Sequence, residues 1–222
     1  EKPNIYCGTE KVASLEALIG HEHLQRWSSS LIFTTLVETS SYATQVEILS
    51  DGHYAYIADS NAGVQIVDLQ ASPDPTIVGN HPTEIWSDSA WDVVANSTHA
   101  FVAYDNLFSD SRIHILDISN PVSPVLVDSI TLPGSGIRAP YQLTLNGNDL
   151  YVGDTTAGIH VVDVSDPNNA SVSETFGTGA NFYAIAVGGD YAVAATSLGL
   201  KVYDADRVNI ANASLTGSGE AR

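Results

Sequence analysis

Four dipeptides in this 222-residue chain have the residue types of a ligand-binding site. Each begins with a hydroxyl or aromatic residue, and three continue with an amide or a carboxylate: Thr44-Gln45, Trp91-Asp92, Tyr141-Gln142 and Tyr183-Ala184. Aromatic faces beside such polar groups suit a sugar, a peptide or a cation. The candidate binding residues are therefore Gln45, Trp91, Asp92, Tyr141, Gln142 and Tyr183. The competing interpretation is that the rings fill space between neighbouring sheets and the polar groups satisfy strand ends.

Three carboxylates form a second candidate set, because Asp59, Asp105 and Asp154 all fall where predicted hairpins turn. Hard oxygen ligands gathered on one rim could hold Ca²⁺. An Asp at a hairpin also accepts hydrogen bonds from its own turn, and the sequence has no Asp-x-Asp-x-Asp-Gly loop. This pattern favours capping over calcium binding, so we expect no cofactor. We also predict no catalytic residues, since neither a Gly-x-Ser-x-Gly motif nor a glycine-rich phosphate loop occurs.

An internal repeat indicates the elements that must position these residues. Tyr56–Leu69, Tyr151–Val164 and Ala192–Ala205 align without a gap, and Phe101–Ile118 matches them with four inserted residues. Each copy ends an apolar run with an Asp, and these anchors are Asp68, Asp117, Asp163 and Asp204. The anchors recur 41 to 49 residues apart, a period that suits four short strands per unit.

The repeat units read as strands, because β-branched residues dominate and Gly, Pro, Asn and Asp punctuate the chain about every ten residues. Four-stranded units arranged about an axis make a β-propeller. The predicted fold is therefore all-β, a propeller of about four four-stranded blades over residues 34–217. The expected blades cover about 43–80, 90–130, 140–177 and 181–217. Their innermost strands begin near the four dipeptides, which would place the dipeptides at the mouth of the central channel.

The strand that precedes each anchor also resembles a known family. Val64-Gln-Ile-Val-Asp68, Ile113-His-Ile-Leu-Asp117 and Ile159-His-Val-Val-Asp163 are similar to the LVIVD repeat, which is found in predicted propellers of bacterial and archaeal exported or surface proteins. The resemblance covers residues 43–216 and implies the propeller fold. It implies no common reaction and no fixed catalytic set. The fourth unit departs from the pattern, since no Pro-rich turn follows Asp204.

The two ends of the chain do not match the repeat. Residues 1–33 form an extension in which 10–26 predict a short helix, and residues 218–222 form a tail. Residues 34–40 resemble the outermost strand of a blade, which leaves one strand too many. This strand could join the last blade and close the ring, or pair with an exposed strand edge on another chain, such as a second copy. A third alternative is that the chain is part of a longer propeller.

Net charge restricts the partners. The chain carries 26 Asp and Glu residues against 8 Lys and Arg residues, for a formal net charge of −18. A field of this sign repels a phosphate backbone and an anionic membrane surface, so nucleic acid is excluded as a partner. No run of about 18 apolar residues occurs, so no membrane span is predicted. The remaining partner is another protein chain or a small ligand.

Several features favour export. The chain begins at Glu1 and contains no Met, which we interpret as the removal of a secretory signal. Sequons at Asn96, Asn169 and Asn212 are candidate glycosylation sites. We expect a secreted, extracellular or cell-surface protein, or one held in a periplasm. Its expected function is that of a non-catalytic binding or assembly module. The alternative is a calcium-supported hydrolase or lyase at the channel mouth, built from Asp92 with the three hairpin carboxylates.

Overall fold

The computed structural model describes residues 35–83, 88–106, 111–134, 142–155, 157–177 and 179–204. The chain divides into two units, Glu1–Glu38 and Thr39–Arg222, and the described part of the second unit consists of antiparallel β-strands and their turns. The described residues contain no helix with the length and apolar character needed to cross a membrane. The helix expected over 10–26 and the last part of the fourth expected blade, residues 205–217, both lie outside the described residues.

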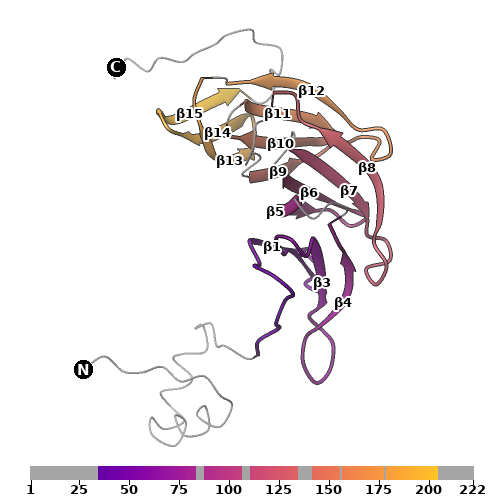
Figure 1. Cartoon of the computed structure of the whole chain (residues 1–222). Helices are drawn as coiled ribbons and strands as arrows, with labels where there is room; N and C mark the ends of the chain where they lie inside the picture. Colours follow the sequence, from indigo (N-terminus) through magenta and orange to yellow (C-terminus); the bar gives the residue numbers. More distant parts are fainter. Residues whose placement is uncertain are drawn as a thin grey trace, which may run out of the picture. The chain divides into compact units, whose positions relative to one another are not determined.

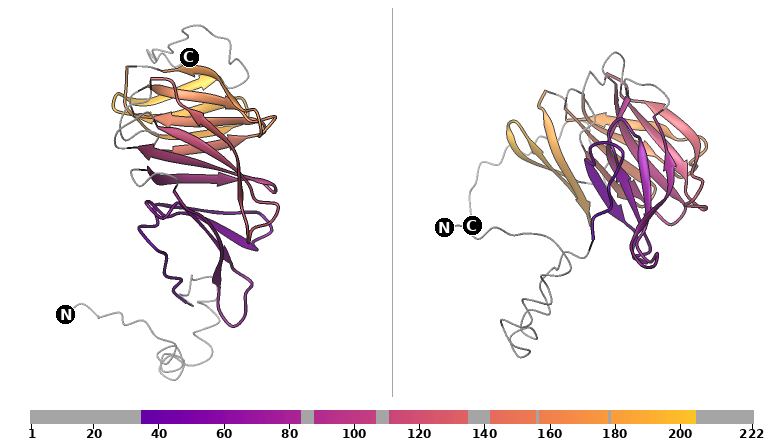
Figure 2. Two further views of the ribbon diagram at one scale, coloured as in Figure 1. Left: turned by 45° about the vertical axis from the view of Figure 1, so that its right-hand side comes forward. Right: turned by 60° about the horizontal axis from the view of Figure 1, so that its bottom comes forward.

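The second unit contains four antiparallel sheets in chain order (Figures 1 and 2). The first sheet is formed by β1 (Gln45–Ile48), β2 (Tyr54–Ala58), β3 (Val64–Asp68) and β4 (Thr76–His81). The second is formed by β5 (Asp88–Ala95), β6 (His99–Asn106), β7 (Arg112–Asp117) and β8 (Val125–Thr131). The third is formed by β9 (Gln142–Asn146), β10 (Asp149–Asp154), β11 (Gly158–Asp163) and β12 (Ser171–Phe176). The fourth is formed by β13 (Phe182–Gly188), β14 (Tyr191–Thr196) and β15 (Gly199–Asp204).

Each sheet pairs its strands in sequence order, and the innermost strands β1, β5, β9 and β13 lie next to one another in that order. Sheets that repeat radially, each with neighbouring strands joined by hairpins, are the units of a propeller. The prediction of an all-β fold built from propeller-like sheets is therefore confirmed. Three sheets have the expected four strands, and the fourth has three strands within the described residues.

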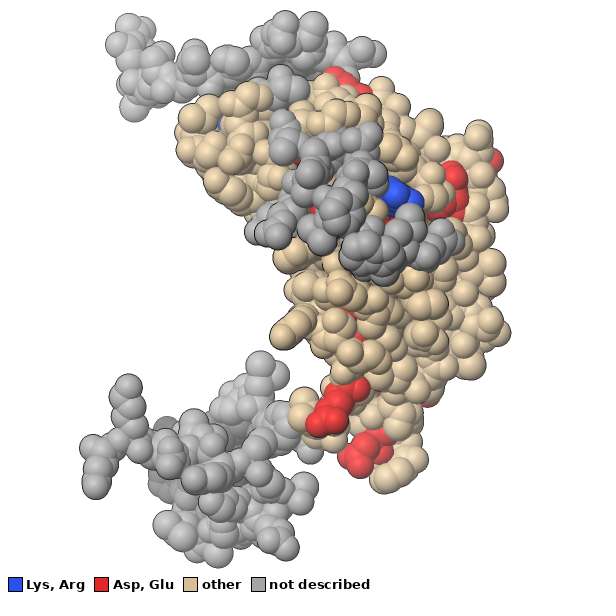
Figure 3. All heavy atoms as spheres, viewed as in Figure 1, with Lys and Arg blue, Asp and Glu red and all other residues tan. Residues whose placement is uncertain are grey.

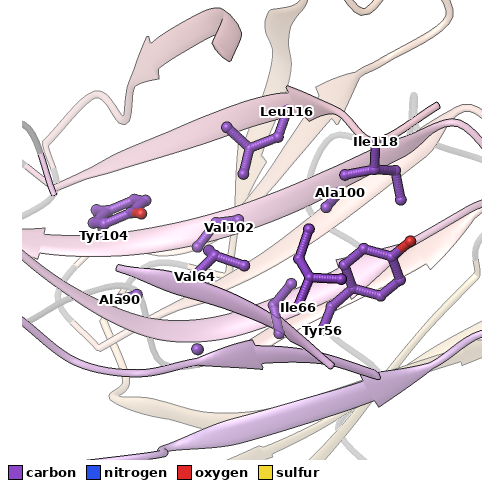
Figure 4. Close-up of a cluster of buried hydrophobic side chains, with 11 residues drawn as sticks. Tyr56, Val64, Ile66, Ala90, Ala100, Val102, Tyr104, Leu116 and Ile118 are labelled. Atoms are coloured by element: carbon purple, nitrogen blue, oxygen red, sulfur yellow. The ribbon is translucent and has the colours of Figure 1, made fainter. Parts of the chain in front are cut away.

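Apolar side chains point to both faces of each sheet, and the second and third sheets each pack against a neighbour on both sides. We call the face that packs on the next sheet along the chain the leading face, and the opposite face the trailing face. Tyr56 and Ile66 on the leading face of the first sheet share a buried cluster with Val102 and Leu116 on the trailing face of the second (Figure 4). Successive side chains of these central strands point to opposite faces, and because both faces are covered the strands are buried almost without interruption.

The same arrangement recurs at the next two junctions. Phe101 on the leading face of the second sheet is buried with Leu143 on the trailing face of the third. Ile159 on the leading face of the third sheet is buried with Ile185 on the trailing face of the fourth. The core therefore consists of three successive layers between four sheets.

The anchor carboxylates occupy equivalent corners. Asp68 accepts a hydrogen bond from the Gln70 N–H at 2.8 Å, and Asp163 accepts one from the Ser165 N–H at 2.9 Å. Asp117 makes the same bond with the Ser119 N–H at 2.8 Å. A carboxylate that bonds to the backbone two residues later closes an Asx turn, which redirects the chain from the third to the fourth strand of each sheet.

The strand predicted over 34–40 is wrong for its described part, because residues 35–40 form no strand. The segment before β1 is held by contacts to a side chain rather than by strand pairing. The Thr39 hydroxyl donates to Asp59 Oδ1 at 2.8 Å, and the Ser41 N–H donates to Asp59 Oδ2 at 3.0 Å. This segment is therefore fastened by a buried carboxylate at the β2–β3 hairpin, while strand-to-strand hydrogen bonds begin only at Thr44 and Gln45.

The gap-free alignment of the fourth unit is also wrong. Thr196 pairs with Gly199 across a two-residue turn, whereas Asp154 pairs with Gly158 across three residues. The shorter turn shifts β14 by one residue, so that Val193 takes the position of Tyr151 in the repeat. Because a one-residue shift exchanges the two faces of a strand, Ala192 is buried on the trailing face rather than placed on the leading one.

Candidate functional site

A hollow of about 390 Å³ opens where the four innermost strands begin. Its lining residues are Thr44, Gln45, Trp91, Asp92, Gln142 and Tyr183. The structure thus brings together five of the six candidate binding residues, and the sixth, Tyr141, lies outside the described residues. In Figure 3 the surface is hollowed on the side where these inner strands lie. Every sheet contributes at least one residue to the lining.

The two aromatic residues of the hollow are placed by β-bulges. The pairing of β5 with β6 shifts between Ala90 and Asp92, which leaves Trp91 as the extra residue. The pairing of β13 with β14 shifts in the same way around Tyr183. A bulge turns the extra side chain out of the regular alternation. Trp91 is therefore 38% exposed and Tyr183 50% exposed, although both belong to innermost strands.

Trp91 is held from the neighbouring strand. Its indole Nε1 donates a hydrogen bond to Asp105 Oδ2 at 3.2 Å, and Asp105 is buried. This contact orients the ring on β5 while leaving part of its surface exposed. An aromatic ring fixed in this way can stack on a ligand at a small cost in conformational entropy.

Asp92 is the buried carboxylate of the hollow. Its Oδ2 accepts the Leu143 N–H at 2.6 Å, and its Oδ1 accepts the Val93 N–H at 2.8 Å. The pKa of Asp92 is raised to about 6, mainly by burial and also by the charge of Glu47, against the two N–H donors and the Gln45 side chain, which lower it. A carboxyl with this pKa changes its charge between mildly acidic and neutral pH.

Polar residues of the four dipeptides also connect successive sheets. The Thr44 hydroxyl donates to the Ala90 carbonyl at 3.0 Å, joining the first sheet to the second. Gln142 Oε1 accepts the Ile185 N–H at 2.8 Å, joining the third sheet to the fourth. Together with the Asp92–Leu143 bond, these contacts connect all four sheets. The polar residues of the dipeptides therefore fasten the sheets, while the Trp91 and Tyr183 rings remain partly accessible.

The hairpin carboxylates have three different environments. Asp154 accepts the Ala157 N–H at 2.8 Å and so caps its own turn, whereas Asp59 reaches across to Thr39 and Ser41. Asp105 holds Trp91. Within the described residues, no group of three or more His, Cys, Asp or Glu side chains could hold a metal ion. The common hairpin position therefore does not give these carboxylates a common structural role.

A buried polar cluster in the third sheet was not proposed as a site from the sequence. His160 Nδ1 lies 2.8 Å from Thr175 Oγ1, and its Nε2 lies 3.5 Å from Asp154 Oδ2. Both His160 and Asp154 are fully buried. The equivalent His114 is also buried, and desolvation lowers its pKa to about 4, so its ring is neutral at physiological pH. The repeat shows that these two histidines occupy equivalent positions, but only the folded sheets show that both side chains are buried.

The candidate glycosylation residues differ in accessibility. Asn96 caps the β5–β6 turn, because its Oδ1 accepts the N–H groups of Thr98 at 2.9 Å and of His99 at 2.8 Å. Asn169 is exposed in the turn before β12, and Asn212 lies outside the described residues. Of the two described sequons, only that at Asn169 presents an exposed Asn side chain.

The sheets and their inner hollow define the protein as a β-propeller. Residues 40–83, 88–131 and 141–178 match the LVIVD repeat, and the chain belongs to this repeat family. The family suspected from the strands that precede the anchors is thus confirmed. No curated protein matches the sequence.

Solved structures show the same fold at low sequence identity. BamB from Moraxella catarrhalis is 17% identical with a TM-score of 0.58, and the match covers 76% of this chain and 48% of that one. Hydrazine synthase from Kuenenia stuttgartiensis is 13% identical with a TM-score of 0.63, covering 79% of this chain and 56% of that one. The computationally designed Ika4 protein is 12% identical with a TM-score of 0.55, covering 78% of this chain and 99% of that one.

The covered lengths differ between the natural and the designed structures. This chain spans about half of BamB and of hydrazine synthase, but almost all of Ika4. The four sheets therefore correspond in extent to about half of the two natural chains.

Proposed function

We propose that this protein is an exported, non-catalytic binding module whose ligand surface is the hollow at the starts of the innermost strands. The observation that carries the proposal is the pair of bulged aromatic residues, Trp91 and Tyr183, which face the same hollow from the second and the fourth sheet. Bulges beside a site commonly re-aim side chains for function. The buried polar residues around them already serve the fold.

The chemistry of the lining favours a neutral or cationic ligand with a flat apolar face. Among the residues that the structure describes, the lining includes two aromatic rings and the side-chain amides of Gln45 and Gln142, and no basic residue. The net charge of −18 disfavours anionic ligands. A sugar ring or a peptide carrying an aromatic or basic side chain fits this description. Calcium or another cofactor is not part of the proposal.

The enzymatic alternative has less support from the contacts. Asp92 accepts two backbone N–H groups, Asp59 accepts two hydrogen bonds from the segment before β1, and Asp105 orients Trp91. These carboxylates have structural partners that explain their positions. A calorimetric titration with Ca²⁺ after chelation tests the alternative, because a calcium-supported enzyme requires a saturable heat of binding.

The binding proposal is tested on arrays of neutral glycans and of peptides, with hits measured by calorimetry on the full chain. We expect Trp91→Ala and Tyr183→Ala each to weaken binding about tenfold or more, since each removes a stacking face. Tyr42→Ala is the matched control, because Tyr42 is exposed but does not line the hollow. Binding that is equal in all three variants would place the ligand elsewhere and overturn the proposal.

The exported location is tested by fractionating cells of the source organism and probing with an antiserum. The protein is expected outside the cytoplasmic fraction. The exposed Asn169 and the acidic surface support this location, and more Asp and Glu than Lys and Arg are visible on the face in Figure 3. Recovery only with cytoplasmic markers would refute it.

A further inference from the structure

The last sheet exposes a face that every other sheet buries. Leu200 and Val202 on β15 are 71% and 39% exposed. By register they match Ile159 and Val161 of the third sheet, which are 0% and 1% exposed against the fourth. The equivalent residues of the first two sheets are also fully buried: Val64, Ile66, Ile113 and Ile115. The leading face of the fourth sheet thus carries apolar residues at positions that are buried in the other three sheets.

The first sheet exposes the complementary face. Val46 and Ile48 on β1 are 51% and 52% exposed. Val46 matches Val93, Leu143 and Ile185 in the other three sheets, all of which are at most 3% exposed because a preceding sheet covers them. The trailing face of the first sheet therefore has the residue types of a buried junction, without a preceding sheet within the described part of the second unit.

We infer that these two faces bind each other between two copies of this chain, so that the fourth sheet of each copy packs on the first sheet of the other. Leu200 has the place of Ile159, and Val46 has the place of Ile185, and those two residues share one buried cluster at the third junction. The junction between the third and fourth sheets is thus a model for the contact between the fourth sheet of one copy and the first sheet of the other. This inference concerns the ends of the sheet array and does not depend on ligand binding at the hollow.

The number of sheets in one chain favours a closed pair of two copies over an open chain of many copies. The four sheets cover about half of the BamB and hydrazine synthase chains. Two halves related by a twofold axis make the same junction twice and close a ring, which leaves no end face exposed. Closure also removes both apolar faces from water, which is the main driving force for association.

The new junction lacks one contact that the second and third interior junctions have. Asp92 and Gln142 each accept an N–H from the following sheet, whereas the equivalent position in the fourth sheet is Ala184. At the other end, the Val46 N–H is satisfied by its own Gln45 Oε1 at 3.1 Å. We therefore expect a junction that depends on apolar packing and that dissociates on dilution.

The test is sedimentation velocity of the full chain from nanomolar to high micromolar concentration. A reversible species with the mass of two chains is expected. Leu200→Lys and Val46→Glu should each weaken the pairing at least about tenfold, since each places an unpaired charge in a buried junction. Val122→Lys is the matched control, because Val122 is 62% exposed in a turn away from both faces. Far-UV circular dichroism and thermal melting confirm that each variant is folded.

A mixture of the two charged variants separates this arrangement from other dimers. Combining the Leu200→Lys chain with the Val46→Glu chain creates one junction with opposite charges and one junction with the original residues. Pairing should therefore recover in the mixture to near the original strength. The inference is overturned by a strict monomer, by an open-ended ladder of masses, by a dimer that both charged variants leave unchanged, or by variants whose mixture does not recover. A monomer in which residues 1–34 or 205–222 cover Leu200 would appear as the first of these outcomes.

Discussion

The carboxylate of Asp92 in the second sheet accepts the backbone N–H of Leu143 in the third sheet at 2.6 Å. This bond joins the inner edges of two sheets at the base of the candidate ligand hollow. It also gives a backbone partner to a carboxylate whose pKa is raised to about 6, mainly by burial. The stability of the propeller and the chemistry of the hollow are therefore coupled through one side chain.

Asp92 should make stability fall as the pH rises from about 4 to about 6. In this window the folded chain holds a proton on Asp92 that the unfolded chain, with a pKa near 3.9, has lost. Asn imitates the protonated carboxyl, so the free energy of unfolding of the original chain relative to Asp92→Asn should drop by up to about 3 kcal/mol across the window. Urea unfolding at several pH values measures the difference.

Asp163→Asn is the control for that series and should show the opposite sign. The Ser165 side chain and backbone N–H lower the pKa of Asp163, so its contribution to stability is present above the unfolded-state pKa and is lost as the pH falls through the folded one. A difference for Asp92 that does not change with pH, or that increases with pH, would show that its carboxyl is not protonated in this range.

Gly79 should be required at the junction of the first two sheets. A Cβ built at Gly79 would overlap the carbonyl oxygen of Pro121, which is backbone and cannot rotate away. Gly79→Ala should therefore destabilise the protein by about 1–3 kcal/mol, measured by chemical unfolding. Gly188→Ala is the matched control, because a Cβ there meets no atom within 4 Å. Equal stability of the two variants would mean that the first two sheets can separate without cost.

Ala184→Gln should strengthen the pairing of two chains. Gln at this position could accept the Val46 N–H of the second copy, in the way that Gln142 accepts the Ile185 N–H. At each of two junctions the Val46 N–H would exchange its local bond to Gln45 for a bond across the junction, which should tighten the pair about tenfold. Sedimentation equilibrium provides the measurement. Ser197→Gln, in the β14–β15 turn, is the comparison variant that should leave the pairing unchanged.

Much of the architecture could be predicted from local sequence. Asp68, Asp117 and Asp163 mark equivalent corners because an Asx turn needs only a carboxylate and a backbone N–H two residues later. The positions of the dipeptides on the inner strands could also be predicted, because they follow from the repeat. The aligned Gly and Asp residues did not predict the shorter β14–β15 turn. The pairing of the two strands decides how many residues remain in the turn.

The repeat, the strand pattern, the corners and the family could all be predicted from local sequence, because they depend on near neighbours in the chain. Which side chains are accessible depends instead on how the strands pair and how the sheets pack. The bulges at Trp91 and Tyr183 arise from pairing with another strand, and the exposure of Leu200 and Val46 depends on whether a sheet lies against them. Identical apolar patterns are buried in the middle of the array and exposed at its ends, since burial is a property of the neighbouring sheet.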